Sequence, residues 1–329
     1  MKKITVLFIL SAVVICIISC SNNQPGMDES SLPPVDSSSV ISDVSYSTDD
    51  FIDSTDGSKM IFVKGGAYTM GWSHTEDINV FKKNNPTHKV TVDDFFISAN
   101  EITNSQYCIF LNEVGNLEEE EKPYINTNSG FDDIRCQIEQ KEGQFVVKSG
   151  YENYPVICVS WYGAKAYCKW MAEKTGKKYR LPTEAEWEYV ARNGGKDIRY
   201  SWGNDFPKDK KGGNIADAAN KKKYPDFMMA TEEYNDGYVY TSPVSLFDPN
   251  ELGLYDMTGN VAEWCSDWNG DYSSATVTNP TGPVTGNDKV KRGGDWNTGL
   301  STISLFQRSG NRPGATSTMT GFRICMACK

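Results

Sequence analysis

The chain has 329 residues, of which 43 are acidic and 33 are basic, so its formal net charge at pH 7 is -10. This acidity argues against a nucleic-acid partner, because phosphate binding depends on Lys and Arg side chains. Only two histidines are present, His74 and His88, which excludes a metal centre built from three histidines.

The N-terminus has the pattern of a lipoprotein signal peptide. Lys2 and Lys3 precede an apolar run over residues 6–18, which is shorter than the about 20 residues that a transmembrane helix needs. The run ends in the letters IISC, which resemble a bacterial lipobox. We therefore predict cleavage after residue 19 and acylation of Cys20, for example by palmitate; an uncleaved anchor and plain secretion are the alternatives. The expected location is the bacterial cell envelope, on the outer membrane surface.

Residues 20–55 are rich in Ser, Asp and Pro and poor in large apolar side chains. Such a segment cannot bury enough apolar surface to offset the entropy lost on ordering. The composition predicts a flexible tether between the acylated Cys20 and a folded domain over residues 56–329.

Seven cysteines follow Cys20, so an exported chain has at least one unpaired thiol. Cys108, Cys158 and Cys168 stand in apolar surroundings and are predicted to be small core residues. The pair Cys325 and Cys328 has a C-x-x-C spacing that suits metal binding or redox cycling, but no second Cys or His pair lies nearby. Which cysteines pair is left open.

Capping residues and apolar spacing predict three helices. A Thr/Gln capping box begins the segment 103–115, which ends in glycine. A Ser cap begins the segment 160–176, which also ends in glycine, and a Thr/Glu capping box begins the segment 183–191.

The third predicted helix carries three carboxylates, Glu184, Glu186 and Glu188. Their spacing allows an acid–base interpretation. However, Glu186 belongs to the capping box, and we expect Glu184 and Glu188 to face solvent. A structural role for all three is therefore predicted.

Short apolar runs predict strands at 60–63, 89–92, 146–147 and 155–159. Long connections rich in Gly, Asn, Asp and Pro separate the predicted elements, above all over residues 194–243. Connections of that length are normally functional or held by ions. The pattern indicates one α+β domain with much irregular structure.

Several segments resemble, in the expected order, the formylglycine-generating-enzyme (sulfatase-modifying factor) family. They are MIFVKGGAYTMG from residue 60, RLPTEAEWEY from residue 180, GLYDMTGNVAEW from residue 253, KRGGDW from residue 291 and GFR from residue 321. The resemblance implies a C-type lectin-like fold of the α+β class. It has a small twisted antiparallel sheet, few helices and extensive ordered loops.

Formylglycine-generating enzymes use a pair of cysteines between the motifs that match KRGGDW and GFR. In this chain the interval, residues 295–320, contains no cysteine. Without a thiolate there is no soft copper ligand and no redox nucleophile. A second branch of the family builds an iron site from histidines, which two histidines do not supply. We therefore expect neither copper nor iron and no catalysis of these kinds.

The interval 295–320 also resembles the variable region of surface lipoproteins that retroelements diversify. Small polar residues around a few large apolar ones are typical of a binding surface that tolerates side-chain exchange; an ordinary irregular loop is the alternative. Trp296, Leu300, Leu305 and Arg308 are expected to hold the scaffold. The expected exposed, exchangeable ligand-binding positions are Asn297, Thr298, Gly299, Thr302, Ser304, Phe306, Ser309, Gly310, Asn311, Arg312, Ala315, Thr316, Ser317, Thr318 and Met319.

The resemblance further implies two structural Ca²⁺ sites. Ca²⁺ takes six to eight oxygen ligands and accepts both carboxylates and backbone carbonyls. Simple polar turns are the alternative. The first expected set is Asn214, Ile215, Asp236 and Tyr238, and the second is Asp256, Gly259, Val261 and Glu263.

The sequence thus favours a lipid-anchored protein that binds an unidentified surface ligand, protein or glycan, through residues 295–320. Two other functions stay open. One is a scaffold lipoprotein of an envelope complex, which would expose a contiguous apolar patch. The other is an oxidase that acts on a cysteine-containing peptide.

Overall fold

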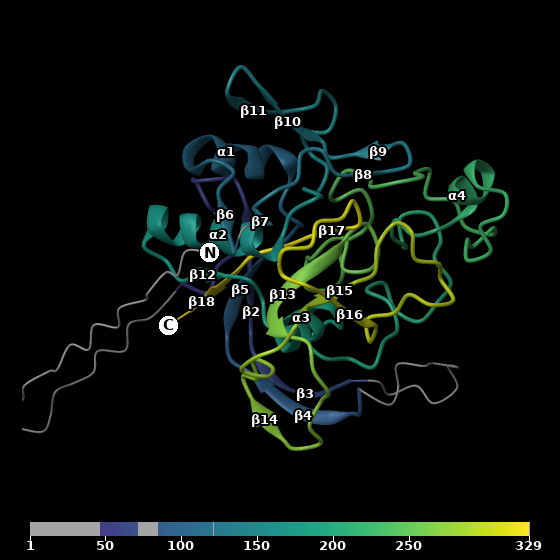
Figure 1. Ribbon diagram of the computed structural model, residues 1–329. Helices are drawn as coiled ribbons and strands as arrows, with labels where there is room; N and C mark the ends of the chain where they lie inside the picture. Colours follow the sequence, from purple (N-terminus) through teal and green to yellow (C-terminus); the bar gives the residue numbers. More distant parts are fainter. Residues whose placement is uncertain (1–46, 72–84, 121, 329) are drawn as a thin grey trace, which may run out of the picture. The chain divides into compact units, whose positions relative to one another are not determined.

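The computed structural model describes residues 47–71, 85–120 and 122–328, and these described residues form one compact unit (Figure 1). The predicted signal peptide, Cys20, most of the tether and His74 lie outside the described residues. Within these ranges no helix is both long and apolar enough to cross a membrane.

The described part is an α+β fold with short helices, several small sheets and long irregular connections (Figure 1). Its helices are α1 (Asn104–Val114), α2 (Trp161–Thr175), α3 (Glu184–Ala191) and α4 (Ala218–Lys223). The five-stranded sheet has the order β1 (Phe51–Ile52), β2 (Lys59–Val63), β5 (Phe95–Ser98), β18 (Cys325–Ala327) and β12 (Tyr179–Arg180). A four-stranded sheet has the order β16 (Arg308–Asn311), β15 (Lys289–Arg292), β13 (Ala262–Trp268) and β17 (Thr320–Gly321).

Smaller sheets complete the fold. A three-stranded sheet has the order β14 (Val277–Thr278), β4 (His88–Val92) and β3 (Gly66–Met70). Three two-stranded ribbons are β6 (Glu118–Glu119) with β7 (Lys122–Pro123), β8 (Gly130–Phe131) with β9 (Ile134–Arg135), and β10 (Ile138–Lys141) with β11 (Gln144–Val147). Pairing is antiparallel except between β13 and β17 and between β14 and β4.

Both faces of the five-stranded sheet are covered. Successive side chains of a strand point to opposite faces. Met60 and Phe96 pack in the cluster that contains α1 and α2, whereas their neighbours Ile61 and Ile97 pack in the cluster that contains α3. Burial on both sides explains why β2 and β5 are apolar at consecutive positions.

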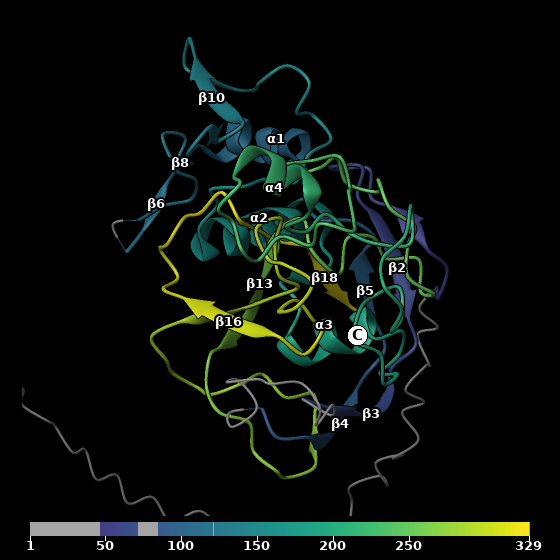
Figure 2. The same ribbon diagram turned by 90° about the vertical axis from the view of Figure 1, so that its right-hand side faces the viewer.

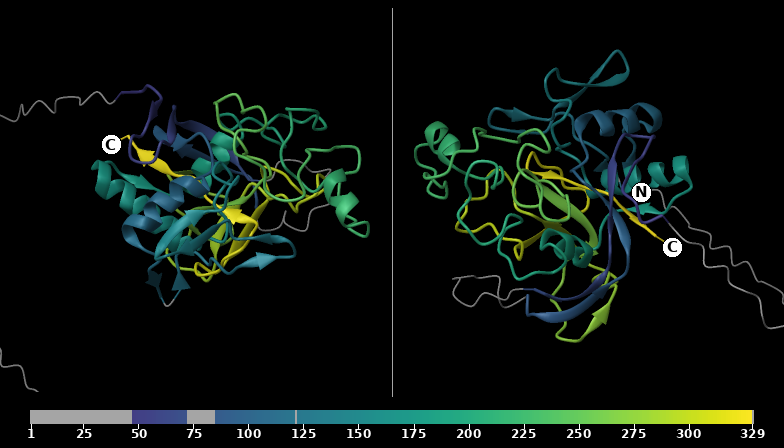
Figure 3. Two further views of the ribbon diagram at one scale, coloured as in Figure 1. Left: turned by 90° about the horizontal axis from the view of Figure 1, so that it is seen from above. Right: turned by 180° about the vertical axis from the view of Figure 1, so that it is seen from behind.

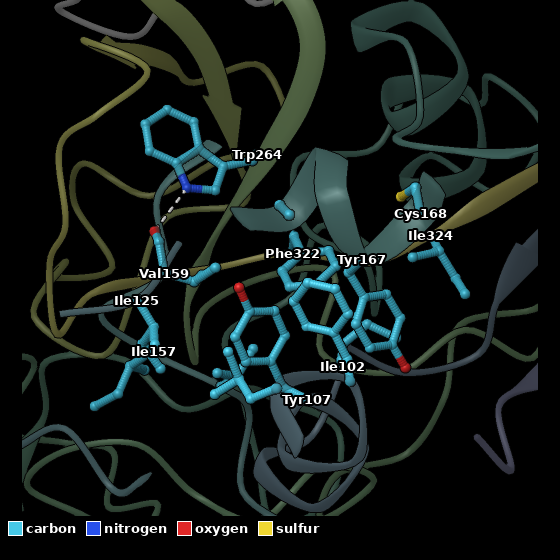
Figure 4. Packing of buried hydrophobic residues seen from close by; sticks show 14 of the residues in the cluster. Ile102, Tyr107, Ile125, Ile157, Val159, Tyr167, Cys168, Trp264, Phe322 and Ile324 are labelled. Carbon is cyan, nitrogen blue, oxygen red and sulfur yellow. Dashed lines mark hydrogen bonds between the residues drawn. The ribbon is translucent and has the colours of Figure 1, made fainter. Parts of the chain in front are cut away.

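Aromatic rings connect the first two helices to the C-terminal segment (Figure 4). The ring of Tyr107 on α1 lies 5.8 Å from that of Tyr167 on α2, and the two rings lie 5.9 and 5.5 Å from that of Phe322. Trp264 of β13 closes the cluster, because its Nε1 donates to the Val159 carbonyl at 3.2 Å. Phe322 is thereby fixed in the core.

The three predicted helices are confirmed, with capping boxes at Thr103 and Thr183 and a cap at Ser160. Three of the four predicted strands are confirmed as parts of β2, β4 and β11. The strand predicted at 155–159 is wrong, because this segment forms only isolated bridges and Cys158 has a φ of 62°. Helix α4, capped by Asp217, was not predicted.

The end of the predicted tether is also wrong. Phe51 and Ile52 form β1 and pair with β2. The buried Asp53 carboxylate accepts hydrogen bonds from Tyr179 at 2.7 Å and from Lys177 at 3.2 Å. The folded domain therefore includes residues 51–55. The sequence prediction missed this because the local composition does not show partners that lie far away in the chain.

Candidate functional site

The carboxylates of α3 do not face solvent, so that expectation is wrong. The side chains of Glu184 and Glu188 are 4% and 0% exposed, because the whole of α3 is buried. Arg308 contacts Glu184 with two hydrogen bonds of 2.8 and 2.7 Å, and Arg292 lies between Glu184 and Glu188. Arg192 completes the network with a 2.9 Å contact to Glu188. We call these five residues the arginine–glutamate network.

This network anchors the middle of the interval 295–320. Arg308 belongs to the interval and is held on α3. The Leu305 carbonyl accepts from Arg292 at 2.9 Å, and the Phe306 ring lies 4.6 Å from the guanidinium of Arg192. Leu305 and Phe306 are 0% and 1% exposed. Residues 303–306 are therefore part of the core, and Arg308 ties the partly buried residues after them to α3.

Trp296 anchors the interval from another side. It is 1% exposed, and its Nε1 donates to the Thr318 carbonyl at 3.1 Å. The rings of Tyr240 and Phe131 lie 5.1 and 6.5 Å away. The expected scaffold roles of Trp296, Leu305 and Arg308 agree with this burial, and Leu300 is partly buried against a separate small cluster.

Residues 297–302 lie beside two irregular segments, one that leads into α4 and one that follows α4 (Figures 2 and 3). The Thr298 carbonyl accepts from Ala216 at 3.1 Å, and Leu300 donates to Thr231 at 3.2 Å. A Cβ at Gly299 would lie 1.8 Å from the Met229 carbonyl oxygen. Gly299 is consequently unable to accept other side chains, so its predicted exchangeability is wrong.

The other two parts of the interval are β16 and residues 313–319. β16 is the edge strand of the four-stranded sheet (Figure 2). Residues 313–319 lie against the start of α2, where Trp161 donates to the Pro313 carbonyl at 2.9 Å and Cys158 to the Ser317 carbonyl at 2.8 Å. Three backbone-anchored segments thus carry the interval's partly exposed side chains.

The structure divides the fifteen expected binding positions by exposure. Gly299, Ser304, Phe306 and Thr318 are buried, so their predicted exposure is wrong; anchoring contacts with distant elements explain it. The exposed positions are Ser309 and Arg312. The partly exposed positions are Asn297, Thr298, Thr302, Gly310, Asn311, Ala315, Thr316, Ser317 and Met319.

Two ionisable groups lie beneath the first segment. Asp295 accepts hydrogen bonds from the Asn297 backbone at 3.0 Å and from the Thr298 hydroxyl at 3.1 Å. Burial raises the pKa of Asp295, and burial lowers the pKa of the neighbouring Lys291. Burial thus disfavours the charged form of both groups.

The described thiols are not presented at this surface. Six of the seven are buried, and Cys328 is partly exposed. Burial raises the pKa of Cys325, and the same cause raises that of Cys265. Cys325 lies inside the sheet as part of β18, so only Cys328 of the C-x-x-C pair reaches the surface.

The first expected calcium set forms one cluster. Asp236 accepts hydrogen bonds from Ile215 at 3.0 Å and from Tyr238 at 2.7 Å, and its backbone N–H donates to the carboxylate of Asp217. Burial, together with the nearby charge of Asp217, raises the pKa of Asp236 to about 8. The buried Asn214 Oδ1 has no hydrogen-bond partner. These groups fit a cation.

The second expected set has a different environment. The buried Asp256 Oδ1 also has no hydrogen-bond partner, and burial raises the pKa of Asp256 to about 6. Glu263, however, accepts from Arg323 at 2.6 and 2.7 Å and from Trp187 at 2.8 Å. Because the Arg323 guanidinium already neutralises Glu263, this second set fits a cation less well than the first. Gly259 and Val261 lie on the loop between the two carboxylates.

In the described ranges no three Asp, Glu, His or Cys side chains come close enough together to hold a metal ion. A calcium site here would therefore depend on amide and backbone oxygens, as both expected sets do.

Sequence reasoning missed framework side chains that border the interval. Met228 and Met229 are 86% and 43% exposed, and Met229 touches the backbone of Gly299. Phe131 is 52% exposed beside Trp296. The two adjacent methionines in an otherwise polar connection could have indicated these side chains in the sequence, because exposed Met side chains suit adaptable binding surfaces.

A model of the sulfatase-modifying factor enzyme 1-like domain matches residues 50–328. The chain is 35% identical over 292 residues to the formylglycine-generating enzyme of Mus musculus, covering 80% of this chain and 74% of that protein. It is 32% identical over 269 residues to the serine/threonine-protein kinase Pkn1 of Chlamydia pneumoniae, covering 80% of this chain but only 37% of the kinase.

Among solved structures, the chain resembles variable protein 1 of Treponema denticola, with a TM-score of 0.59 and 23% identity. The match covers 84% of this chain and 98% of that one, which establishes a shared fold. The extent of the family match and the identity to the mouse protein settle the family. The chain belongs to the family of the sulfatase-modifying factor enzyme 1-like domain, which includes the formylglycine-generating enzymes.

Proposed function

We propose that this chain is a lipid-anchored protein of the cell surface that binds a protein or glycan through a diversified face, and that it is not a catalyst. The face consists of the exposed and partly exposed positions of residues 297–319. The anchor is the acylated Cys20, which joins the domain to the membrane through the tether. Nucleic acid is not a partner, since the acidic chain repels phosphate.

One observation carries this proposal: buried anchors alternate with small polar surface positions inside the interval. Trp296, Leu305 and Arg308 fix the backbone from the core, while Ser309 and Arg312 are exposed. Substitutions at exposed positions have little effect on the free energy of unfolding, whereas substitutions at buried anchors lower it. A fixed backbone with exchangeable side chains creates new binding surfaces without refolding. The shared fold with a protein named as variable supports the same function.

The enzymatic alternative needs a thiol at this surface. The interval contains no cysteine, and Cys158, which lies beneath Ser317, is 0% exposed. A thiol in that position does not reach a peptide substrate. This argument supports binding without chemistry.

The test is an oxidase assay of the purified chain with added copper and a peptide that carries the cysteine of a sulfatase motif. We expect no aldehyde product, while an active formylglycine-generating enzyme in the parallel reaction forms one. Aldehyde at a rate that depends on the chain would overturn the proposal.

The scaffold alternative predicts a contiguous apolar patch. The exposed large apolar side chains of the described residues instead belong to separate segments, such as Ile52 on β1, Leu117 before β6 and Val284 after β14. Co-purification of the chain with fixed envelope proteins in constant proportion would favour the scaffold.

We further propose that Ca²⁺ binds the first set, Asn214, Ile215, Asp236 and Tyr238. Adding Ca²⁺ to chelator-treated protein should raise the melting temperature by about 5 °C at one hundred times the Kd, because a ligand that binds only the folded state stabilises it. Asp236→Asn should abolish this increase. Asp226→Asn, at an exposed position, should preserve it. A titration with neither heat nor a melting shift would contradict the calcium site.

A further inference from the structure

Two buried cysteines from separate parts of the chain meet beneath the interval 295–320. Cys136 follows β9 and Cys158 precedes α2, and they are 1% and 0% exposed. Both contact the Ser129 carbonyl oxygen: the Cys136 backbone N–H donates to it at 3.0 Å and the Cys158 thiol at 4.0 Å. Each thiol also shifts the pKa of the other, which places the two side chains close together.

The surroundings of this pair differ from those of an ordinary core cysteine. Both residues belong to the same apolar cluster, but each thiol there has a second thiol beside it. The neighbouring Cys158 side chain lowers the pKa of Cys136, whereas Cys136 raises the pKa of Cys158, so Cys136 ionises before its partner. A thiolate is the species that attacks a disulfide. Cys136 is thus the attacking thiolate, and Cys158 supplies the second sulfur.

We propose that Cys136 and Cys158 form a disulfide in the exported protein. The Cys136 thiolate attacks a disulfide-containing oxidant and forms a mixed disulfide, with release of one oxidant thiol. Cys158 then loses its proton and displaces the second oxidant thiol. One S–S bond forms in the protein, two S–H bonds are lost, and two electrons pass to the oxidant. Oxidation takes place during folding, before the pair is enclosed.

The crosslink joins two regions that the backbone links only loosely. Cys136 lies in the ribbon-rich segment 116–154. The Cys158 N–H donates to the Ser317 carbonyl at 2.8 Å, and its own carbonyl accepts from Asn126 at 3.0 Å. Cys158 also has a φ of 62°, a conformation that surrounding contacts must enforce on a residue other than glycine. A disulfide at this position holds the base of residues 313–318, which reduces the ordering needed on ligand binding.

Peptide mapping of the unaltered chain tests the proposal directly. The full chain is produced with its signal peptide, its remaining thiols are alkylated under denaturing conditions, and trypsin is added without reductant. We expect peptides 136–141 and 149–165 to run as one linked species that separates on reduction. Alkylation of both Cys136 and Cys158 in exported protein would overturn the proposal.

Melting measurements give a second test. A crosslink that closes a loop of this size stabilises the folded state mainly by restricting the unfolded one. Reduction before unfolding should lower the melting temperature of the unaltered chain by about 5 °C. Cys328→Ser should behave in the same way, because its thiol lies elsewhere, whereas Cys136→Ala should show no effect of reductant. An equal response of the unaltered chain and Cys136→Ala to reductant would contradict the crosslink.

Discussion

Replacing Glu188 by alanine is expected to lower the free energy of unfolding by about 3–5 kcal/mol, the range for breaking a buried ion pair. The Glu188 carboxylate contacts Arg192 at 2.9 Å and also Arg292, and it accepts the Gly71 N–H at 2.9 Å. Without it, Arg192 keeps its hydrogen bonds to the Lys196 and Thr69 carbonyls. The carboxylate then left beside Arg192 is that of Asp197, at 3.7 Å and with a side chain that is 62% exposed. Denaturant unfolding followed by circular dichroism measures the change.

Glu173 is the matched control. It also lies on a helix and pairs with a residue four positions away, Lys169, at 3.7 Å, but the two side chains are 66% and 76% exposed. Glu173→Ala should change the free energy of unfolding by less than about 0.5 kcal/mol. Equal small effects at Glu173 and Glu188 would mean that α3 is not buried as described.

Arg308 and Arg312 are expected to differ sharply although both belong to the same interval. Arg308 is bound to Glu184 by two hydrogen bonds and donates to the Gly270 carbonyl at 2.6 Å, whereas Arg312 is exposed. Arg308→Ala should lower the free energy of unfolding by about 2–4 kcal/mol, because Glu184 loses a buried partner. Arg312→Ala should change it by less than about 0.5 kcal/mol.

The same pair separates anchoring from binding. Once a ligand has been isolated, Arg312→Ala should alter its Kd without changing the melting temperature. Arg308→Ala should instead lower the melting temperature. If Arg312→Ala destabilised the chain as much as Arg308→Ala, the segment that follows β16 would be part of the core rather than of a binding face.

The helices were predictable because their signals are local. The capping boxes at Thr103 and Thr183 involve residues three positions apart, so a short stretch of sequence contains the whole interaction. Cys158 shows the opposite case. Its surroundings are apolar, as in a strand, but its backbone is held by Ser317 and Asn126, and those contacts join distant parts of the chain.

The site was predictable in position but only partly in exposure. Composition and family motifs indicated the interval 295–320, and the burial of Trp296 and Leu305 agrees with the roles expected of them. Phe306 and Ser304 were misjudged because their partners lie on other elements; Arg192, which covers the Phe306 ring, is an example. Glu184 and Glu188 were misjudged for the same reason. Charged residues are normally exposed, and only the arginines from elsewhere in the chain make their burial favourable.

Sequencing this gene in closely related isolates tests the central claim most directly. If residues 297–319 form a diversified face, differences should concentrate at the exposed and partly exposed positions, such as Ser309, Arg312 and Thr316, and should spare Trp296 and Arg308. Differences spread evenly over residues 50–328, or an interval that is constant among isolates with otherwise different sequences, would contradict it.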